Sequence, residues 1–126
     1  MVRNILLIDD DADELNIFVE ALDAAGIRSR CTWAESAMHV PDIKPVPEII
    51  FLDLNMPRID GFASLKEIKA IPAFMSIPVV LYSTGMNDEL KEKGMLMGAK
   101  ACIAKTYSIN ELAETLMQLL DARVTA

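Results

Sequence analysis

The sequence predicts an α/β fold in which a doubly wound, five-stranded parallel sheet carries helices on both faces. Short continuous apolar runs, typical of strands buried on both faces, alternate five times with segments of helical periodicity. Strands that alternate with helices require a parallel sheet. The length of 126 residues suits one domain. We therefore expect a single domain over residues 1–126, with a core from about residue 3 to 122, and no output domain.

The first half of the chain is expected to hold three strands and two helices. The strands are Ile5–Ile8, Ile49–Leu52 and, more weakly, Arg28–Trp33. The helix after the first strand stops near Gly26, and its apolar face is formed by Leu15, Phe18, Val19 and Leu22. A short helix over residues 34–40 is expected to end at Pro41, before a proline-rich loop that reaches Pro47.

The second half is expected to hold two further strands, Pro78–Tyr82 and Ala101–Ala104, and three helices. The helices run from Phe62 to about Ala70, from the N-cap Asn87 to about Met97 before Gly98, and onward from the capping-box pair Ser108 and Glu111. Their apolar faces are carried by Phe62, Leu65 and Ile68 in the first and by Ile109, Leu112, Ala113 and Leu116 in the last.

Composition and the N-terminus argue against several classes of protein. The formal net charge is −7 and the 12 basic residues are scattered, so we expect no nucleic-acid partner. The first apolar run has four residues, whereas a membrane span needs about 20. We therefore expect a cytoplasmic protein without membrane insertion. Cys31 and Cys102 match no metal-ligand pattern and are expected to be buried, reduced thiols.

Polar side chains follow directly after four of the five expected strands. They are Asp9, Asp10 and Asp11 after the first strand, Asp53 after the third, Ser83 and Thr84 after the fourth, and Lys105 after the fifth. Ligands of open parallel sheets bind outside the carboxyl ends of the strands, so these groups are expected to share one edge. Each has a local explanation when taken alone, and helix capping is enough for Asp11. Carboxylates, hydroxyls and an ammonium together indicate a functional site.

The types of group suggest phosphoryl transfer assisted by a metal ion. Converging carboxylates repel one another unless a cation binds between them, and oxygen ligands favour Mg²⁺ or a similar hard ion. We expect Asp9 and Asp10 to hold the metal, with the Asn55 carbonyl as a further ligand. Asp53 would supply a metal contact and the nucleophilic oxygen, since carboxylates serve as phosphoryl acceptors. Charge on the transferred group would be stabilised by the cation, Lys105 and Ser83.

Several stretches of the sequence resemble the receiver domain of the two-component response-regulator family, and the likeness covers nearly the whole chain. They are Ile5–Asp10, Phe51–Pro57 with Asp60 and Gly61, Pro78–Thr84, and Gly98–Ala99 leading to Lys105. The segment from Asp53 to Gly61 is the most specific of them. The resemblance implies a flavodoxin-like (βα)5 fold with strand order 2-1-3-4-5, as in single-domain receivers similar to chemotaxis regulators.

The resemblance also implies the chemistry of the site. Asp53 would accept a phosphoryl group from a sensor histidine kinase or a histidine phosphotransfer protein, in phosphorelay signal transduction. The cation would be Mg²⁺ or Mn²⁺, and its ligands would be Asp9, Asp10, Asp53 and the backbone carbonyl of Asn55. The protein would assist only its own phosphorylation and dephosphorylation and would not be an enzyme acting on other substrates.

The remaining family positions would shape the response. Ser83 and Thr84 would respond to the phosphoryl group, Lys105 would pair with one of its oxygens, and Asn55 and Gly85 would govern water access. The implied strand order places Cys31 and Cys102 on opposite edge strands, so no disulfide between them is expected.

Two positions depart from the family pattern. Thr106 follows the lysine where the family usually has proline after a cis peptide bond, and a cis Lys105–Thr106 bond would cost roughly 2.5–4 kcal/mol. We expect a trans bond with a shifted loop or a strained cis bond. Cys102 stands where the family usually has a Tyr or Phe that transmits the state of the hydroxyl residue. Tyr107 is a candidate substitute, although packing is its commoner role.

The output is expected to pass through a surface of the domain itself. Phosphorylation would shift an equilibrium in the helix over residues 87–97, the strand over residues 101–104 and the last helix, and so change affinity for an unidentified protein partner. Three methionines offer an adaptable contact surface or, more commonly, fill the core: Met86, Met95 and Met97.

Three other readings remain open. An aspartyl-phosphate phosphatase of the haloacid-dehalogenase type needs a second acid two residues after its nucleophile, where this chain has Asn55. Phosphatases of that type also have no acid pair at the end of their first strand, whereas this chain has Asp9 and Asp10. A degenerate receiver that only binds partners would not need every site position filled. His39 as a phosphohistidine is a lone histidine in a short segment and is the weakest alternative.

Overall fold

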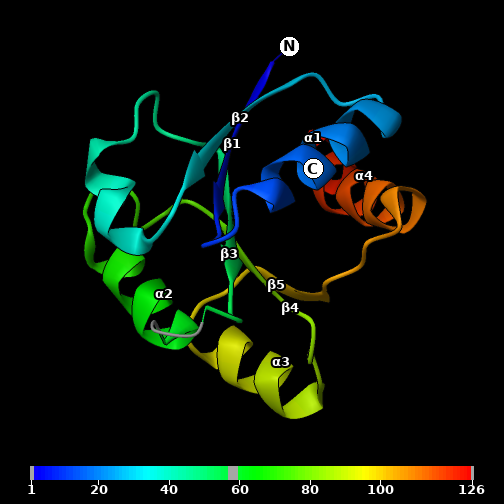
Figure 1. Cartoon of the computed structure of the whole chain (residues 1–126). Coiled ribbons are helices and arrows are strands. Elements are labelled where there is room, and N and C mark those ends of the chain that lie inside the picture. Colours follow the sequence, from blue (N-terminus) through cyan, green and yellow to red (C-terminus); the bar gives the residue numbers. More distant parts are fainter. Residues whose placement is uncertain (1, 57–59, 126) are drawn as a thin grey trace.

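The computed structural model describes residues 2–56 and 60–125, and a five-stranded parallel sheet forms its centre (Figure 1). The strands are β1 (Arg3–Ile8), β2 (Ser29–Ala34), β3 (Ile49–Asp53), β4 (Val79–Ser83) and β5 (Ala101–Ala104). They lie in the order β2-β1-β3-β4-β5, and each neighbouring pair is parallel. The predicted sheet and its strand order are confirmed. Residues 57–59 of the predicted turn after β3 lie outside the described residues.

Helices cover both faces of the sheet. On one face α1 (Asp13–Ala24) packs beside α4 (Ile109–Thr125), as Figure 1 shows. The other face carries the 3₁₀-helix η1 (Ala37–Asp42), α2 (Gly61–Ala70) and α3 (Asp88–Leu96). Because successive strand residues point to opposite faces, each buried strand feeds two separate hydrophobic clusters. No helix in the described part of the chain combines the length and apolar character needed to cross a bilayer.

The sequence signals for helix ends are largely confirmed. Asn87 Oδ1 accepts the backbone N–H of Leu90 at 2.9 Å and so caps α3. Gly26 and Gly98 follow α1 and α3 with φ of 73° and 100°, a left-handed conformation that glycine adopts without steric cost. The N-cap of α1 is Ala12 and has no side-chain cap, so the capping role expected for Asp11 is wrong; its carboxylate accepts the N–H of Asp13 at 2.9 Å in the turn before the helix.

Other local predictions are wrong. The short helix begins at Ala37, and Pro41 lies inside it. It consists of successive 3₁₀ turns, in which His39 N–H donates to Ser36 and Ile43 N–H to Val40, so the missing N–H of Pro41 breaks neither bond. Val19 is 38% exposed, because the buried face of α1 includes Ala21 in its place. Both cysteines are free and lie on opposite edge strands as expected, but they are half-buried rather than buried.

Thr106 extends the predicted capping box at the start of α4. The N–H of Glu111 donates to Ser108 Oγ at 3.3 Å, as the spacing predicts. In a capping box the Glu111 side chain would accept the Ser108 N–H, but here Thr106 stands between them. The Thr106 hydroxyl accepts the Ser108 N–H at 3.1 Å and donates to the Glu111 carboxylate at 2.9 Å. The Lys105–Thr106 peptide is trans, one of the two expected alternatives. The threonine that stands in place of proline therefore ties the loop after β5 to the helix.

Candidate functional site

The ends of three strands bring Asp9, Asp53 and Lys105 into contact. The Lys105 ammonium lies 3.2 Å from Asp53 Oδ2 and 3.4 Å from Asp9 Oδ2. The two carboxylates, which follow β1 and end β3, are 0% and 1% exposed. Parallel strands in register place these groups at one edge of the sheet.

Asp9, Asp10 and Asp53 form an acidic cluster. Each offers a carboxylate oxygen, and these oxygens all lie within 4.8 Å of one another. Asp10 is exposed, so the cluster opens to solvent on its side. Within the described part of the chain, three carboxylates beside the Lys105 ammonium leave excess negative charge, and an oxygen-only set of this kind fits a hard divalent cation. The donor chemistry of the cluster therefore fits the expected metal ion.

Burial sets the electrostatics of the site. Burial raises the pKa of Asp53 above its usual value. The hydrogen bond from the Asn55 N–H, 2.7 Å from Asp53 Oδ1, opposes this rise. The Asp9 carboxylate raises the pKa further, and the Lys105 ammonium lowers it. Burial alone would lower the pKa of Lys105, but the carboxylates of Asp53, Asp9 and Glu14 outweigh it, so that pKa is raised. The ammonium therefore stays charged, whereas ionisation of Asp53 is costly until more positive charge arrives.

The loops after β3 and β4 are joined through Asn55. Its side-chain carbonyl accepts the N–H of Thr84 at 2.7 Å and the Thr84 hydroxyl at 3.2 Å. Ser83 is buried; its hydroxyl accepts the N–H of Gly85 at 3.2 Å, and its backbone carbonyl accepts the Lys105 N–H at 2.9 Å. The predicted residues Asn55, Ser83, Thr84 and Gly85 thus form one bonded network beside Asp53.

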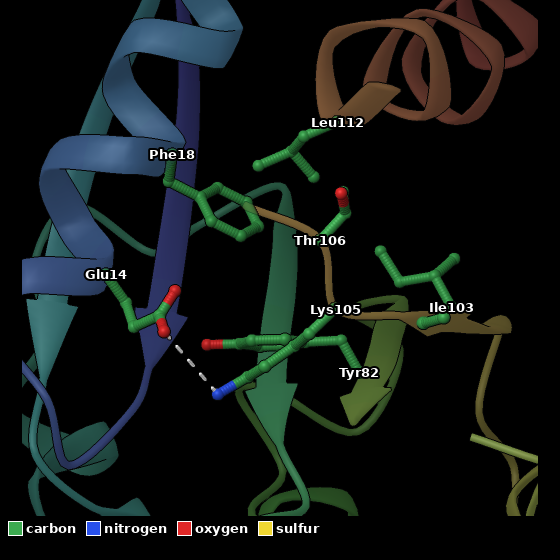
Figure 2. A pocket seen from close by; sticks show the side chains of 8 residues that line it. Glu14, Phe18, Tyr82, Ile103, Lys105, Thr106 and Leu112 are labelled. Atoms are coloured by element: carbon green, nitrogen blue, oxygen red, sulfur yellow. Dashed lines mark ion pairs between the residues drawn. The ribbon is translucent and has the colours of Figure 1, made fainter. Parts of the chain in front are cut away.

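Three residues that the sequence reasoning missed surround Asp9 and Lys105: Glu14, Trp33 and Tyr82. The Tyr82 hydroxyl donates to Asp9 Oδ2 at 2.5 Å, and the Lys105 ammonium lies 4.9 Å from the centre of its ring. Glu14 Oε1 lies 3.9 Å from the same ammonium, as Figure 2 shows. The Trp33 indole N–H donates to the Asp9 backbone carbonyl at 2.8 Å. A buried Tyr hydroxyl or Trp indole N–H needs a hydrogen-bond partner, so the places of Tyr82 and Trp33 in expected strands were the sequence signal for these contacts.

A small cavity of about 10 Å³ lies beside this group, between α1, α4 and the end of β5 (Figure 2). Its walls are Glu14, Phe18, Tyr82, Ile103, Ala104, Lys105, Thr106 and Leu112. Space of this size holds about one water molecule. The cavity connects Lys105 and Tyr82 with Thr106 and Leu112, and so with the start of α4.

The atypical and surface positions are also placed. Cys102 lies under α3, with Sγ 3.8 Å from the Lys91 carbonyl. Tyr107 is 71% exposed, so the packing role expected for it is wrong. Met97 is half-buried against the core as expected, whereas Met95 is 50% exposed and does not fill the core. Met86 is half-buried.

Comparison with known proteins gives one consistent family. The sequence profile described as the response regulator receiver domain matches residues 5–117. The chain is 24% identical over 125 residues to the probable methanogenesis regulatory protein FilR2 of Methanothrix harundinacea, with 93% of this chain and 81% of that protein covered. It is 28% identical over 120 residues to the phosphate regulon transcriptional regulatory protein PhoB of Pseudomonas aeruginosa, with 94% of this chain covered but only 52% of PhoB.

The solved structures agree with this result. The crystal structure of the Mn(2+)-bound form of response regulator Rcp1 superposes with a TM-score of 0.75 at 25% identity, covering 93% of this chain and 91% of that one. The similarity therefore extends over nearly the whole described fold.

Proposed function

Because the chain belongs to the response regulator receiver domain family of two-component signalling, we propose that Asp53 is its phosphoacceptor. The observation that supports this most is the contact between the buried Asp53 carboxylate and Lys105, at 3.2 Å, inside a cluster of three acids. A carboxylate next to a fixed ammonium can attack phosphorus while the charge of the transferred group is neutralised. Receiver domains are regulatory phosphoacceptors, and the proposed residue gives this chain the same role.

We propose that Mg²⁺ or Mn²⁺ assists the transfer. Receiver domains bind a divalent metal, and a Mn²⁺-bound form is known for the similar regulator Rcp1. In this chain Asp9, Asp10, Asp53 and the backbone carbonyl of Asn55 would hold the ion, in keeping with the carboxylate oxygens that lie within 4.8 Å of one another. When bound, the cation would supply positive charge to the transferred oxygens.

The chain's own residues account for the rest of the proposed reaction. An Asp53 oxygen forms the new bond to phosphorus as the bond from phosphorus to the donor's leaving atom breaks. Lys105 and the Ser83 hydroxyl bind the peripheral oxygens, which requires the ammonium to shift from the Asp9 and Asp53 carboxylates it now contacts. Thr84 assists Ser83. Asn55 and Gly85 govern the access of water to the acyl phosphate, and Gly85 offers no side-chain shield.

An intact-mass experiment tests the proposal. After incubation with Mg²⁺ and acetyl phosphate, the native protein should gain one labile phosphoryl group, and Asp53→Asn should gain none. Asp23→Asn, an exposed aspartate of α1, is the matched control and should behave like the native protein. An equal adduct on Asp53→Asn would refute the assignment. Absence of any adduct on the native protein would favour a receiver that only binds partners.

The physiological donor is proposed to be a sensor histidine kinase or a histidine phosphotransfer protein, as in the family. The output is proposed to run through the surface formed by α3, β5 and α4, which corresponds to the helix over residues 87–97, the fifth strand and the last helix of the sequence prediction. Its support is exposed apolar surface on both helices: Met95 at 50%, Leu96 at 81% and Met117 at 41% exposure. An exposed patch of this kind suits a protein partner.

Hydrogen exchange tests the proposed output surface without knowledge of the partner. Acetyl phosphate and Mg²⁺ should change amide exchange in α3, β5 and α4 of the native protein and leave α2 unaffected. Asp53→Asn should show no change under the same conditions. Changes confined to α2, or changes of equal size in the variant, would rule out the proposed route.

A further inference from the structure

Tyr82 links the acidic cluster to the helical layer from a central position in the sheet. It lies in β4, one residue before Ser83, and only 2% of its surface is exposed. Its ring stands 5.9 Å from that of Phe18 in α1, and the Lys105 ammonium lies over the same ring. Its hydroxyl donates to Asp9 Oδ2, two strands away in the sheet (Figure 2 shows the hydroxyl end directed past Lys105).

Both carboxylate oxygens of Asp9 have hydrogen-bond partners. Its Oδ1 accepts the N–H of Asp11 at 2.9 Å and its Oδ2 accepts the Tyr82 hydroxyl at 2.5 Å. Its backbone carbonyl is held by Trp33 in the neighbouring strand β2. Asp10, by contrast, is exposed. The partners that fix a ligand's orientation typically change metal affinity 10–100-fold when they are removed.

We propose that Tyr82 is a positioning residue for the divalent cation, holding Asp9 in the orientation that lets it act as a ligand. The inference rests on the cation site of the proposed function. The phenol hydrogen bond fixes the direction of Asp9 Oδ2, and the Lys105 ammonium that contacts Asp9 and Asp53 lies 4.9 Å from the centre of the same ring. Packing alone does not require the hydroxyl, because phenylalanine would fill the same space against Phe18 and the cavity wall.

The test compares Tyr82→Phe with Tyr107→Phe, the same chemical change at the chain's other tyrosine, which is 71% exposed. The one tryptophan, Trp33, is hydrogen-bonded to Asp9 and provides a fluorescence signal for titration with MnCl₂ or MgCl₂ in the absence of a phosphodonor. We expect the Kd of Tyr82→Phe to rise about tenfold. Tyr107→Phe should retain the native Kd.

Two further measurements separate positioning from a purely structural role. The increase in Tm produced by a fixed Mn²⁺ concentration should be smaller for Tyr82→Phe than for the native protein. In phosphorylation by acetyl phosphate, the Mg²⁺ concentration for half-maximal rate should rise while the rate at saturating Mg²⁺ stays near the native value. An unchanged or lower Kd for Tyr82→Phe overturns the inference. A native protein that binds neither ion instead overturns the proposed cation site itself.

Discussion

Replacing Lys105 with methionine is expected to lower the free energy of unfolding of the cation-free protein by about 3 kcal/mol. The substitution preserves much of the apolar stem but removes the ammonium that lies 3.2 Å from Asp53 and 3.4 Å from Asp9. Both carboxylates are almost fully buried and would face one another without a counter-charge. Urea unfolding at pH 7 in the presence of EDTA measures the loss.

Lys100→Met is the matched control, because Lys100 is exposed and stands directly before β5. Its effect should stay within about 0.5 kcal/mol. A saturating divalent cation should restore part of the stability lost by Lys105→Met, since it replaces the missing positive charge. Similar losses for the two variants would show that Lys105 does not balance the acidic cluster.

The pH dependence follows from the raised pKa of Lys105. Burial alone would lower this pKa, but the carboxylates of Asp53 and Asp9 raise it by more than burial lowers it. The folded protein therefore holds the ammonium proton more tightly than the unfolded chain does. The stabilisation is complete below the unfolded value of about 10.4 and is lost as the pH rises through the folded pKa. The difference between the native protein and Lys105→Met should therefore persist at neutral pH and narrow in strong alkali, where the ammonium is lost.

The sheet could be predicted from the sequence because its strands are buried on both faces. Continuous apolar runs such as Ile49–Leu52 have no other common explanation when helical segments separate them. Helix ends at Asn87 and Gly98 were equally visible, because capping is a local interaction. The helix η1 was misplaced because a 3₁₀ turn tolerates Pro41 where an α-helix would not.

Part of the site could be predicted because its residues follow from the predicted strands. Asp9, Asp53, Ser83 and Lys105 stand at or directly after strand ends, so strand order alone brings them to one edge. Tyr82 was missed because its partner Asp9 follows β1, two strands away, and only the three-dimensional structure shows which oxygen its hydroxyl reaches. Glu14 was missed because it approaches Lys105 from α1, in which it reads as an ordinary first-turn acid.

The small residue at position 102 has a structural counterpart in α3. Gly94 is buried in that helix, and a β-carbon built on it would lie 2.8 Å from Cys102 Sγ and 2.8 Å from Leu81 Cδ1. The helix therefore approaches β4 and β5 more closely than any residue with a side chain would allow. The aromatic that the family usually has at this position of β5 is replaced here by a cysteine that packs beneath a glycine.

Gly94→Val is accordingly expected to lower the free energy of unfolding by about 2 kcal/mol, because overpacking a well-filled core costs about 1–3 kcal/mol. The valine would meet Cys102 and Leu81, and Leu81 is fully buried. Glu92→Val, at an exposed position of the same helix, controls for the helix propensity of valine and should cost about 0.5 kcal/mol. Thermal or urea unfolding measures both.

A double-mutant cycle identifies the contact that causes the loss. In a Cys102→Ala background the sulfur is absent, so Gly94→Val should cost about 1 kcal/mol less than in the native background, a coupling expected only of residues in direct contact. The clash with Leu81 would remain, and recovery should therefore be incomplete. Strictly additive effects would mean that α3 shifts away as a rigid body. In that case Cys102 would not be what limits how closely this helix packs on β5.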